Sequence, residues 1–315
     1  MRAFLALMRR ETIEHRGAFI YAPLVLIALL FVFLGGGLVT GRFENIFLEI
    51  ATEYGADATT TAQARTAALA AFAVYAGKVF EFGFLIFALG WLAYFVMLIF
   101  FYSADAYAAD RRNNSMLFWK SMPVSDLKIL MSKFTTATVL VPLIGFAAML
   151  VTGLILAVLS AATRESPAGF MAILGEVLPS YPQVAGTALA STVAVVVWYL
   201  PFFAWVGALS AIVGRWSIPL AFLIPSLLGL IENLVVPDTA RGGTVFGYIA
   251  ERLTFPSIEE GYPKEWFLSG EPINAMRFTA DLFGRLDPIQ IAIGVVFSAV
   301  VLYAASEYRR RTIDN

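Results

Sequence analysis

The segment DAYAADRRNNSMLFWKSMPVSDLKILMSK, residues 105–133, is the most polar long stretch between two apolar runs of the chain. It holds five of the 22 Lys and Arg residues, and an apolar group, Met116 to Trp119, lies in its middle. A basic segment between two long hydrophobic runs is typical of a cytoplasmic loop between two membrane-spanning helices. The rest of the chain can be placed relative to this loop.

The centre of the loop carries the signals of a short isolated helix. Asn114 or Ser115 can cap its N-terminus by accepting a backbone N–H. Pro123 cannot continue the helix and disfavours a helical conformation in the residue before it. The helix would make about two turns, roughly 10 Å in length. Ser125 followed by Asp126 is a second N-cap signal and predicts that a new helix begins there.

The composition of the chain is typical of a membrane protein. Hydrophobic residues make up 59%, charged residues 14%, and the mean hydropathy is +0.77, whereas soluble domains carry about 25% charged residues. The net charge of −1 gives no nucleic-acid signature, and the absence of Cys excludes disulfides and thiolate chemistry. The sequence therefore predicts a polytopic membrane protein.

Six apolar runs are each long enough to cross a hydrocarbon core of about 30 Å. They cover about residues 18–39, 79–104, 135–160, 185–213, 218–236 and 288–305. We therefore expect an all-α fold with six transmembrane helices in a single domain, residues 1–315. The weakest boundary is Gly214 to Ser217, which leaves only a four-residue hairpin between the fourth and fifth runs.

The distribution of basic residues predicts that both termini are cytoplasmic. In that orientation 13 of the 22 Lys and Arg lie inside, on about half as many loop residues as lie outside. The external loops are then about 40–78 and 237–287, and residues 161–184 also lie outside. Helical pieces are expected near 58–76, 244–253 and 274–285. The aromatic-rich last loop is either a gate over an exit path or an interfacial cap whose rings lie at headgroup depth.

Residues 2–16 predict a short basic helix on the cytoplasmic membrane surface. Met1, Phe4, Leu5, Met8 and Thr12 share one side of its helical wheel, while Leu7 and Ile13 interrupt the pattern. The helix is either a positive-inside anchor or a contact for a partner as well. The single histidine, His15, is expected to be a surface group of this helix.

Ionisable residues are absent from the interiors of the six runs, which argues against a proton-coupled carrier. Glu81 and Glu232 lie near the predicted outer ends, as possible outer gate residues or as ordinary interface carboxylates. The chain has no phosphate-binding loop, no H-E-x-x-H and no G-x-S-x-G motif. We therefore expect no ATP site, bound cofactor or catalytic residue in this chain.

Small residues recur four apart near the end of the fourth run, at Gly207 and Ala211 and at Ser210 and Gly214. Such a face allows close helix approach in lipid. The approach could serve a dimer or packing within one subunit, and both alternatives stay open at the level of sequence.

The loop at 105–133 resembles the first cytoplasmic loop of the membrane subunits of ABC-2 type ABC transporters. The residues that carry the resemblance are Asp110-Arg111-Arg112, Met116 to Lys120, and Ser121-Met122-Pro123-Val124-Ser125. The six-span layout and the basic N-terminal helix extend it over the rest of the chain. In that family the short helix docks into a groove on an ATPase subunit and is called the coupling helix.

The resemblance implies a permease subunit of an ATP-driven exporter in a bacterial-type cytoplasmic (inner) membrane. An ABC ATPase subunit, in two copies, would hold ATP and Mg²⁺, and a second membrane subunit would be a copy of this chain or a related one. It implies no substrate. The residues that it places against the ATPase are Arg111, Arg112, Met116, Leu117, Phe118, Trp119 and Lys120.

A second hypothesis belongs to a different class of protein. An energy-independent membrane scaffold or assembly protein could use the same loop to bind lipid headgroups, through basic residues beside Phe118 and Trp119. A third, an intramembrane enzyme, lacks any catalytic constellation in the sequence.

Overall fold

The computed structural model describes residues 2–40, 42, 61–112, 125–162, 166–235, 245–255 and 272–313. Every regular element in these residues is a helix, in agreement with the predicted all-α class. The elements are α1 (Arg2–Glu14), η1 (Gly17–Tyr21), α2 (Ala22–Val39), α4 (Thr61–Arg112), α6 (Asp126–Thr135), η2 (Thr136–Leu140), α7 (Val141–Ala161), α8 (Pro167–Val213), η3 (Gly214–Trp216), α9 (Ser217–Val235), α10 (Val245–Leu253), α12 (Ala275–Arg285) and α13 (Pro288–Ile313).

Five helical segments of the described chain are long and apolar enough to cross a membrane, which makes this a multi-pass membrane protein. They are Gly17–Gly37, Gly77–Ala109, Asp126–Ala161, Pro167–Val235 and Pro288–Arg311. Three of them contain the predicted runs two, three and six, and Gly17–Gly37 covers all but the last two residues of run one. The predicted runs four and five lie together on the single segment Pro167–Val235.

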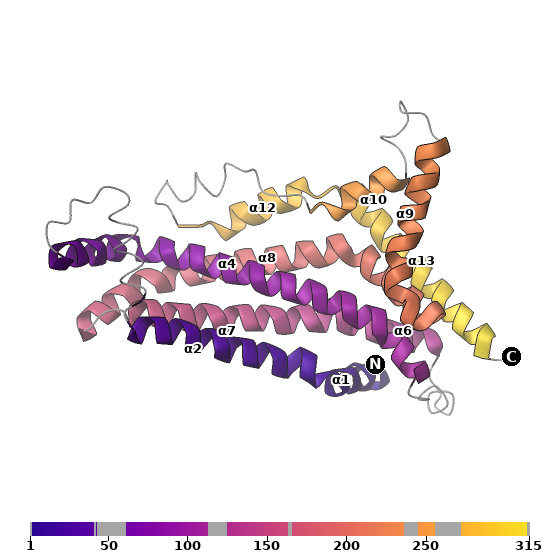
Figure 1. The fold of residues 1–315 in the computed structure, drawn as a ribbon, viewed down its shortest axis with the longest axis horizontal. Helices are drawn as coiled ribbons and strands as arrows, with labels where there is room; N and C mark the ends of the chain where they lie inside the picture. Colours follow the sequence, from indigo (N-terminus) through magenta and orange to yellow (C-terminus); the bar gives the residue numbers. More distant parts are fainter. Residues whose placement is uncertain are drawn as a thin grey trace.

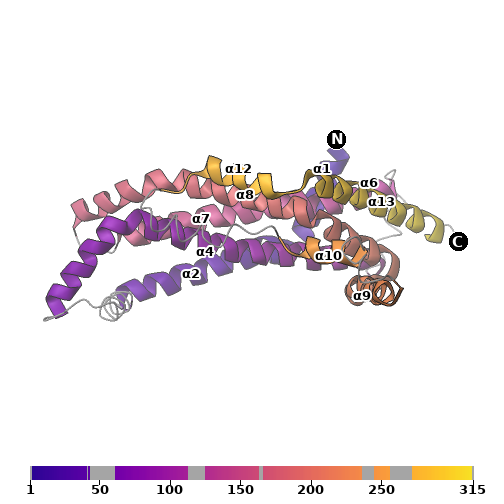
Figure 2. The ribbon, with the colours of Figure 1, turned by 90° about the horizontal axis from the view of Figure 1, so that it is seen from above.

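The junction between α8 and α9 differs from the predicted hairpin. Gly214 has a φ of +63°, a conformation that other residues rarely adopt, and it opens the short turn η3. The turn is fastened to α4, because Ser217 Oγ donates a hydrogen bond to the Ala104 carbonyl at 3.0 Å. As a result α9 leaves α8 at a steep angle instead of returning alongside it (Figures 1 and 2).

The helices α4 and α8 are longer than a membrane requires. Their 52 and 47 residues correspond to about 78 and 70 Å at 1.5 Å per residue, against a hydrocarbon core of about 30 Å. The helix predicted near 58–76 is the first part of α4. Residues 167–184, predicted as an external loop, are helical, and α8 begins where Ser166 Oγ accepts a hydrogen bond from Gly169 N at 3.1 Å.

Aromatic rings on α4 pack directly onto glycines of α7. A side chain at Gly145 would collide with the Phe95 ring, and one at Gly153 would collide with the Phe84 ring. Between these contacts, Trp91 Nε1 donates a hydrogen bond to Thr152 Oγ1 at 2.9 Å. The backbones of α4 and α7 can therefore approach closely along the centre of the bundle, where α2, α4, α7 and α8 run side by side (Figure 1).

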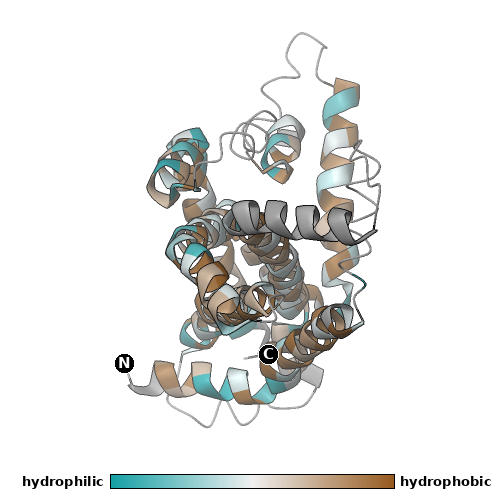
Figure 3. Ribbon diagram, turned by 90° about the vertical axis from the view of Figure 1, so that its left-hand side faces the viewer, coloured by the Kyte–Doolittle hydropathy of each residue, from teal (hydrophilic) through white to brown (hydrophobic). Residues whose placement is uncertain are grey.

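The C-terminal helices lie along α8. Phe278 and Leu282 of α12 pack with Ala194 and Trp198, and Ala305 of α13 packs with Ala208 and Ala211. The expected helices near 244–253 and 274–285 are α10 and α12. Seen along the bundle in Figure 3, hydrophobic colouring gathers in the central helices, while α1 crosses the end of the bundle with mixed colouring.

The small-residue face of α8 is used within one chain. The ring of Tyr107 on α4 lies 3.0 Å from the position that a Cβ would take at Gly207. Next to it, Ser210 Oγ accepts a hydrogen bond from the Ala108 amide at 3.1 Å. Gly207, Ser210 and Ala211 are therefore buried against α4, as the alternative of packing inside one subunit expects.

The contact between Phe84 and Gly153 gives a direct test of this packing. Gly153→Ala should lower the stability of the purified protein by about 1–3 kcal/mol, because the added methyl group must displace a fully buried ring. Gly175→Ala on α8 is the matched control, since nothing lies within 4 Å of its added Cβ, and it should stabilise the helix slightly. Thermal unfolding in one detergent compares the two, and equal melting temperatures would contradict the packing.

Candidate functional site

The N-terminal helix α1 packs onto the bundle through Leu7 and Glu11. Leu7 and Glu11 are buried, while Leu5 is 59% exposed and Ile13 is 55% exposed. Leu5, on the apolar side of the helical wheel, is exposed, and Leu7, which interrupts that side, faces the bundle. This orientation of the helix brings the Glu11 carboxylate to a partner on α6.

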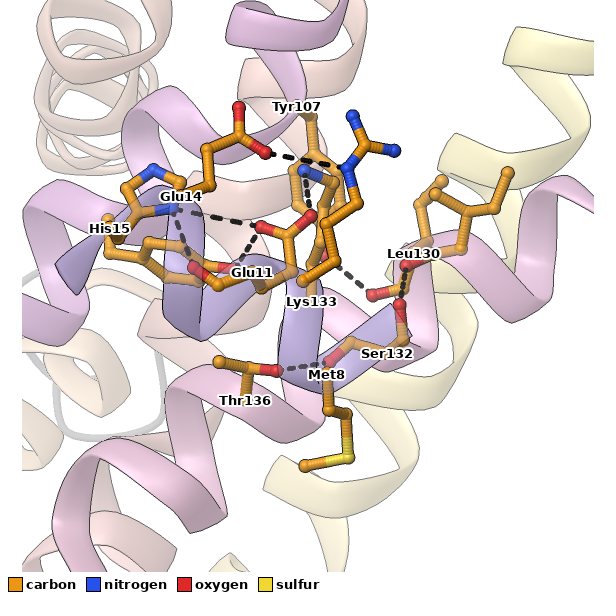
Figure 4. Close-up of polar contacts among 12 residues, drawn as sticks. Met8, Glu11, Glu14, His15, Tyr107, Leu130, Ser132, Lys133 and Thr136 are labelled. Atoms are coloured by element: carbon orange, nitrogen blue, oxygen red, sulfur yellow. Dashed lines mark hydrogen bonds and ion pairs between the residues drawn. The ribbon is translucent and has the colours of Figure 1, made fainter. Parts of the chain in front are cut away.

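That partner is Lys133, whose Nζ lies 2.8 Å from Glu11 Oε1 (Figure 4). Both side chains are almost completely buried. Tyr102 of α4 donates its hydroxyl to the other carboxylate oxygen at 2.9 Å. Because a buried charge without compensation costs several kcal/mol, this cluster ties α1, α4 and α6 together at the end of the bundle where α4 ends and α6 begins, called here the loop end.

His15 belongs to the same cluster and is only partly exposed. Its Nδ1 lies 4.0 Å from Glu11 Oε2 and 3.2 Å from the Glu11 carbonyl oxygen. Its ring stacks on Phe19 and meets the edge of Tyr102. His15 therefore keeps part of its surface exposed, while the helix orientation that buries Glu11 also turns its ring toward the bundle.

Two further bonds fix the helices on either side of residues 113–124. Tyr107 on α4 donates its hydroxyl to the Leu130 carbonyl on α6 at 3.0 Å. The Ala108 amide donates to Ser210 on α8. As predicted, α6 begins at Asp126 after an extended Ser125, although the Ser125 side chain makes no cap hydrogen bond. Both ends of the loop therefore start from anchored helices.

The residues expected to contact an ATPase lie mostly outside the described chain. Met116, Leu117, Phe118, Trp119 and Lys120 fall in the gap between 112 and 125. Arg111 and Arg112 are the last two residues of α4, and the structure describes their backbone only. What the structure supplies is the anchored base from which this segment extends.

Glu81 is buried and spans two elements. Its two carboxylate oxygens accept the Ile273 amide at 3.2 and 3.3 Å, just before α12. Lys78, one turn earlier on α4, places its Nζ 3.5 Å from Glu81 Oε2, and both side chains are buried. Glu81 therefore fastens the segment before α12 to α4.

A cavity of about 450 Å³ opens beside this carboxylate. It lies between α4, α8 and the segment that leads into α12, where Gln183 Oε1 accepts the Ala275 amide at 3.0 Å. Asn274 caps α12 by accepting the Arg277 amide at 3.0 Å. The residues that line it are Gly77, Lys78, Glu81, Glu176, Pro179, Ser180, Gln183, Pro272, Ile273 and Asn274.

Glu232, the other predicted gate residue, does not line this cavity. It lies on α9, which packs on α8 near Trp205. Trp205 is about 33 Å along α8 from Gln183, at 1.5 Å per residue. Of the two carboxylates that the sequence paired as possible gate residues, Glu81 lines this cavity and Glu232 does not.

Arg252 on α10 is a buried cation that the sequence did not single out. Its guanidinium lies 4.5 Å from the Trp198 ring centre, and its Nη2 is 2.6 Å from the place of a Cβ at Gly294. Burial lowers the pKa of Arg252, against the opposing effects of Tyr248 and Asp287. The sequence predicted a helical piece near 244–253 but did not indicate that Arg252 would be buried.

Comparison of the chain with protein-family models, with curated proteins and with solved structures found no match. Among the described residues, no group of three or more His, Cys, Asp or Glu could hold a metal ion.

Breaking the pair at the loop end should be costly. Lys133→Met leaves Glu11 buried without its counter-charge and should lower the free energy of unfolding by about 3–5 kcal/mol. The double variant Glu11→Gln with Lys133→Met should recover most of that loss, because no unpaired charge is left. Thermal unfolding of the three proteins in one detergent measures the difference.

Glu14→Gln is the matched control for this experiment. Glu14 pairs with Arg10 on the same helix at 3.9 Å, but both side chains are 40% exposed. Its loss should change stability by less than about 1 kcal/mol. A Lys133→Met protein as stable as the Glu14→Gln protein would show that the buried pair does not hold α1 in place.

Proposed function

We propose that this chain is the membrane-spanning permease subunit of an ATP-driven ABC-2 type exporter in a bacterial-type cytoplasmic (inner) membrane. A separate ATPase subunit supplies the energy. The observation that carries the proposal is the anchoring of the helices on both sides of residues 113–124. A loop that only covered the end of a bundle would not require buried polar bonds to three neighbouring helices.

The anchored helices provide a path for a mechanical push. The segment from Asp126 to Ala161 is one continuous helical unit of 36 residues, about 54 Å long. Its first turns are tied to α1 through Lys133 and Glu11, and to α4 through Leu130 and Tyr107. A displacement applied at the loop is therefore carried into several spanning helices together, because these bonds prevent a local adjustment.

The positive-inside distribution of Lys and Arg supports a cytoplasmic loop end, within reach of an ATPase. The cavity beside Glu81 then lies toward the external side. The chain has no phosphate-binding loop of its own, so ATP and Mg²⁺ belong to the partner. We further propose two ATPase copies and a second permease subunit, either a copy of this chain or a relative.

The apolar pair Phe118 and Trp119 gives the sharpest test. In the proposal these rings fill a groove on the ATPase, flanked by Arg111, Arg112 and Lys120. Aromatic anchors in desolvated pockets cost about 2 kcal/mol or more when truncated, which is roughly a thirtyfold loss of affinity. The double variant Phe118→Ala with Trp119→Ala should therefore release the ATPase during purification, at unchanged expression and thermal stability of the membrane subunit.

Trp216→Ala is the matched control, because Trp216 is a 58% exposed aromatic residue in η3, next to the loop end of α4. It should leave the ATPase bound. If the double variant retains the ATPase in full amount, the loop is not the coupling element. If no ATPase accompanies the wild-type chain and the double variant binds anionic vesicles more weakly, the headgroup-binding scaffold is the better account.

A further inference from the structure

The cavity beside Glu81 has the construction of a small-molecule site. Its volume of about 450 Å³ falls in the range of ligand pockets, about 300–1,000 Å³. Three separate stretches build its wall: Gly77 to Glu81 on α4, Glu176 to Gln183 on α8, and Pro272 to Asn274 before α12. Two of its charged side chains, Lys78 and Glu81, are more than nine-tenths buried. Charges of this kind persist in a protein interior only when they are paired or when they face a polar partner.

The lining side chains offer mainly hydrogen-bond acceptors, because two of them, Glu81 and Glu176, are carboxylates. Glu81 makes only long contacts, at 3.2 and 3.3 Å to one amide and at 3.5 Å to Lys78. A carboxylate offers about four lone-pair positions, so Glu81 can accept more. Lys78 offsets the charge of Glu81, which leaves the charge of Glu176 without an opposite charge among the lining residues.

A second feature of the cavity is the hydroxyl of Ser180, which makes no hydrogen bond within the described chain. It is 7% exposed and lines the cavity, and its Oγ lies 3.9 Å from the place of a Cβ at Gly77, across the gap between α8 and α4. A buried serine in a helix often bonds to the carbonyl one turn earlier, but in the described chain Ser180 makes no such bond. The hydroxyl of Ser180 is therefore available to hydrogen-bond with a molecule in the cavity.

We propose that this cavity binds a small aliphatic amine in its protonated form. The ammonium group would take up the free acceptor positions of Glu176, Ser180 and Glu81, since an ammonium ion offers three donors and no acceptor. The ring of Pro179 and the side chains of Pro272 and Ile273 give the hydrocarbon part an apolar wall. A ligand carrying only negative charge would meet two carboxylates and one lysine that is already paired.

This site does not rest on the proposed function, because binding is measured on the isolated chain without an ATPase. The experiment is isothermal titration calorimetry of the full-length protein in detergent. The probe is 1,4-diaminobutane at neutral pH, 1,4-butanediol is the uncharged match of equal length, and empty micelles serve as blank. The wild-type protein should bind the diamine saturably at one site and should not bind the diol.

Two variants locate the binding. Glu176→Gln and Ser180→Ala should each weaken the affinity for the diamine about tenfold or more, because each removes a hydrogen bond to a charged group. Neither side chain makes a hydrogen bond in the described chain, so both variants should keep the wild-type melting temperature. Asp281→Asn is the control: it removes one negative charge from an exposed position of α12, outside the cavity, and should leave the affinity unchanged.

Three results would overturn the inference. They are the absence of saturable diamine binding by the folded wild-type protein, equal binding of the diol and the diamine, and an unchanged affinity in both Glu176→Gln and Ser180→Ala. A loss in Asp281→Asn as large as in Glu176→Gln would also contradict it, since it would reveal general attraction to a negative surface.

Discussion

The buried ion pair between Glu11 and Lys133 is the constraint on which the loop end of this protein depends. Two opposite charges removed from water must stay together, because separating them inside the bundle leaves each without compensation. The hydroxyl of Tyr102 adds α4 to the pair. A helix that would otherwise lie loosely at a membrane surface thus becomes a part of the bundle, and α1, α4 and α6 share one fixed arrangement.

The cavity region is built in a different way from the loop end. The segment leading into α12 is held by side-chain acceptors on two helices, Glu81 on α4 and Gln183 on α8, which receive backbone amides two residues apart. A relative shift of α4 and α8 therefore changes the wall of the cavity. Since both helices run without interruption to the loop end, where Ser210 and Ala108 join them, movement there can alter the cavity.

Much of the helical layout could be predicted from local sequence. The apolar runs at 18–39, 79–104 and 135–160 lie within observed helices, because a spanning helix is specified by the length of its own hydrophobic stretch. The helical pieces expected near 244–253 and 274–285 are present as α10 and α12. The extension of α8 back to Pro167 was missed, since residues 161–184 are too polar and too rich in proline to be recognised as part of a long helix.

What the sequence could not provide depends on partners distant in the chain. Glu11 appears as one more polar residue of a basic helix, and only Lys133, more than a hundred positions later, explains why it is buried. The steep path of α9 likewise depends on the bond from Ser217 to Ala104. Glu81 could be selected from its position at the end of an apolar run. Arg252 could not, because its burial follows from the packing of α10 against Trp198 and Gly294.

The central claim is that this chain is a membrane body driven by another polypeptide, and purification from its own cells tests it most directly. The tagged chain would be isolated from membranes in mild detergent and its fractions assayed for ATP hydrolysis. The account predicts that an ATP-hydrolysing protein co-elutes in stoichiometric amount, and that hydrolysis disappears when the two are separated. Full recovery of the chain without any ATPase, or hydrolysis that stays with the isolated chain, would contradict it.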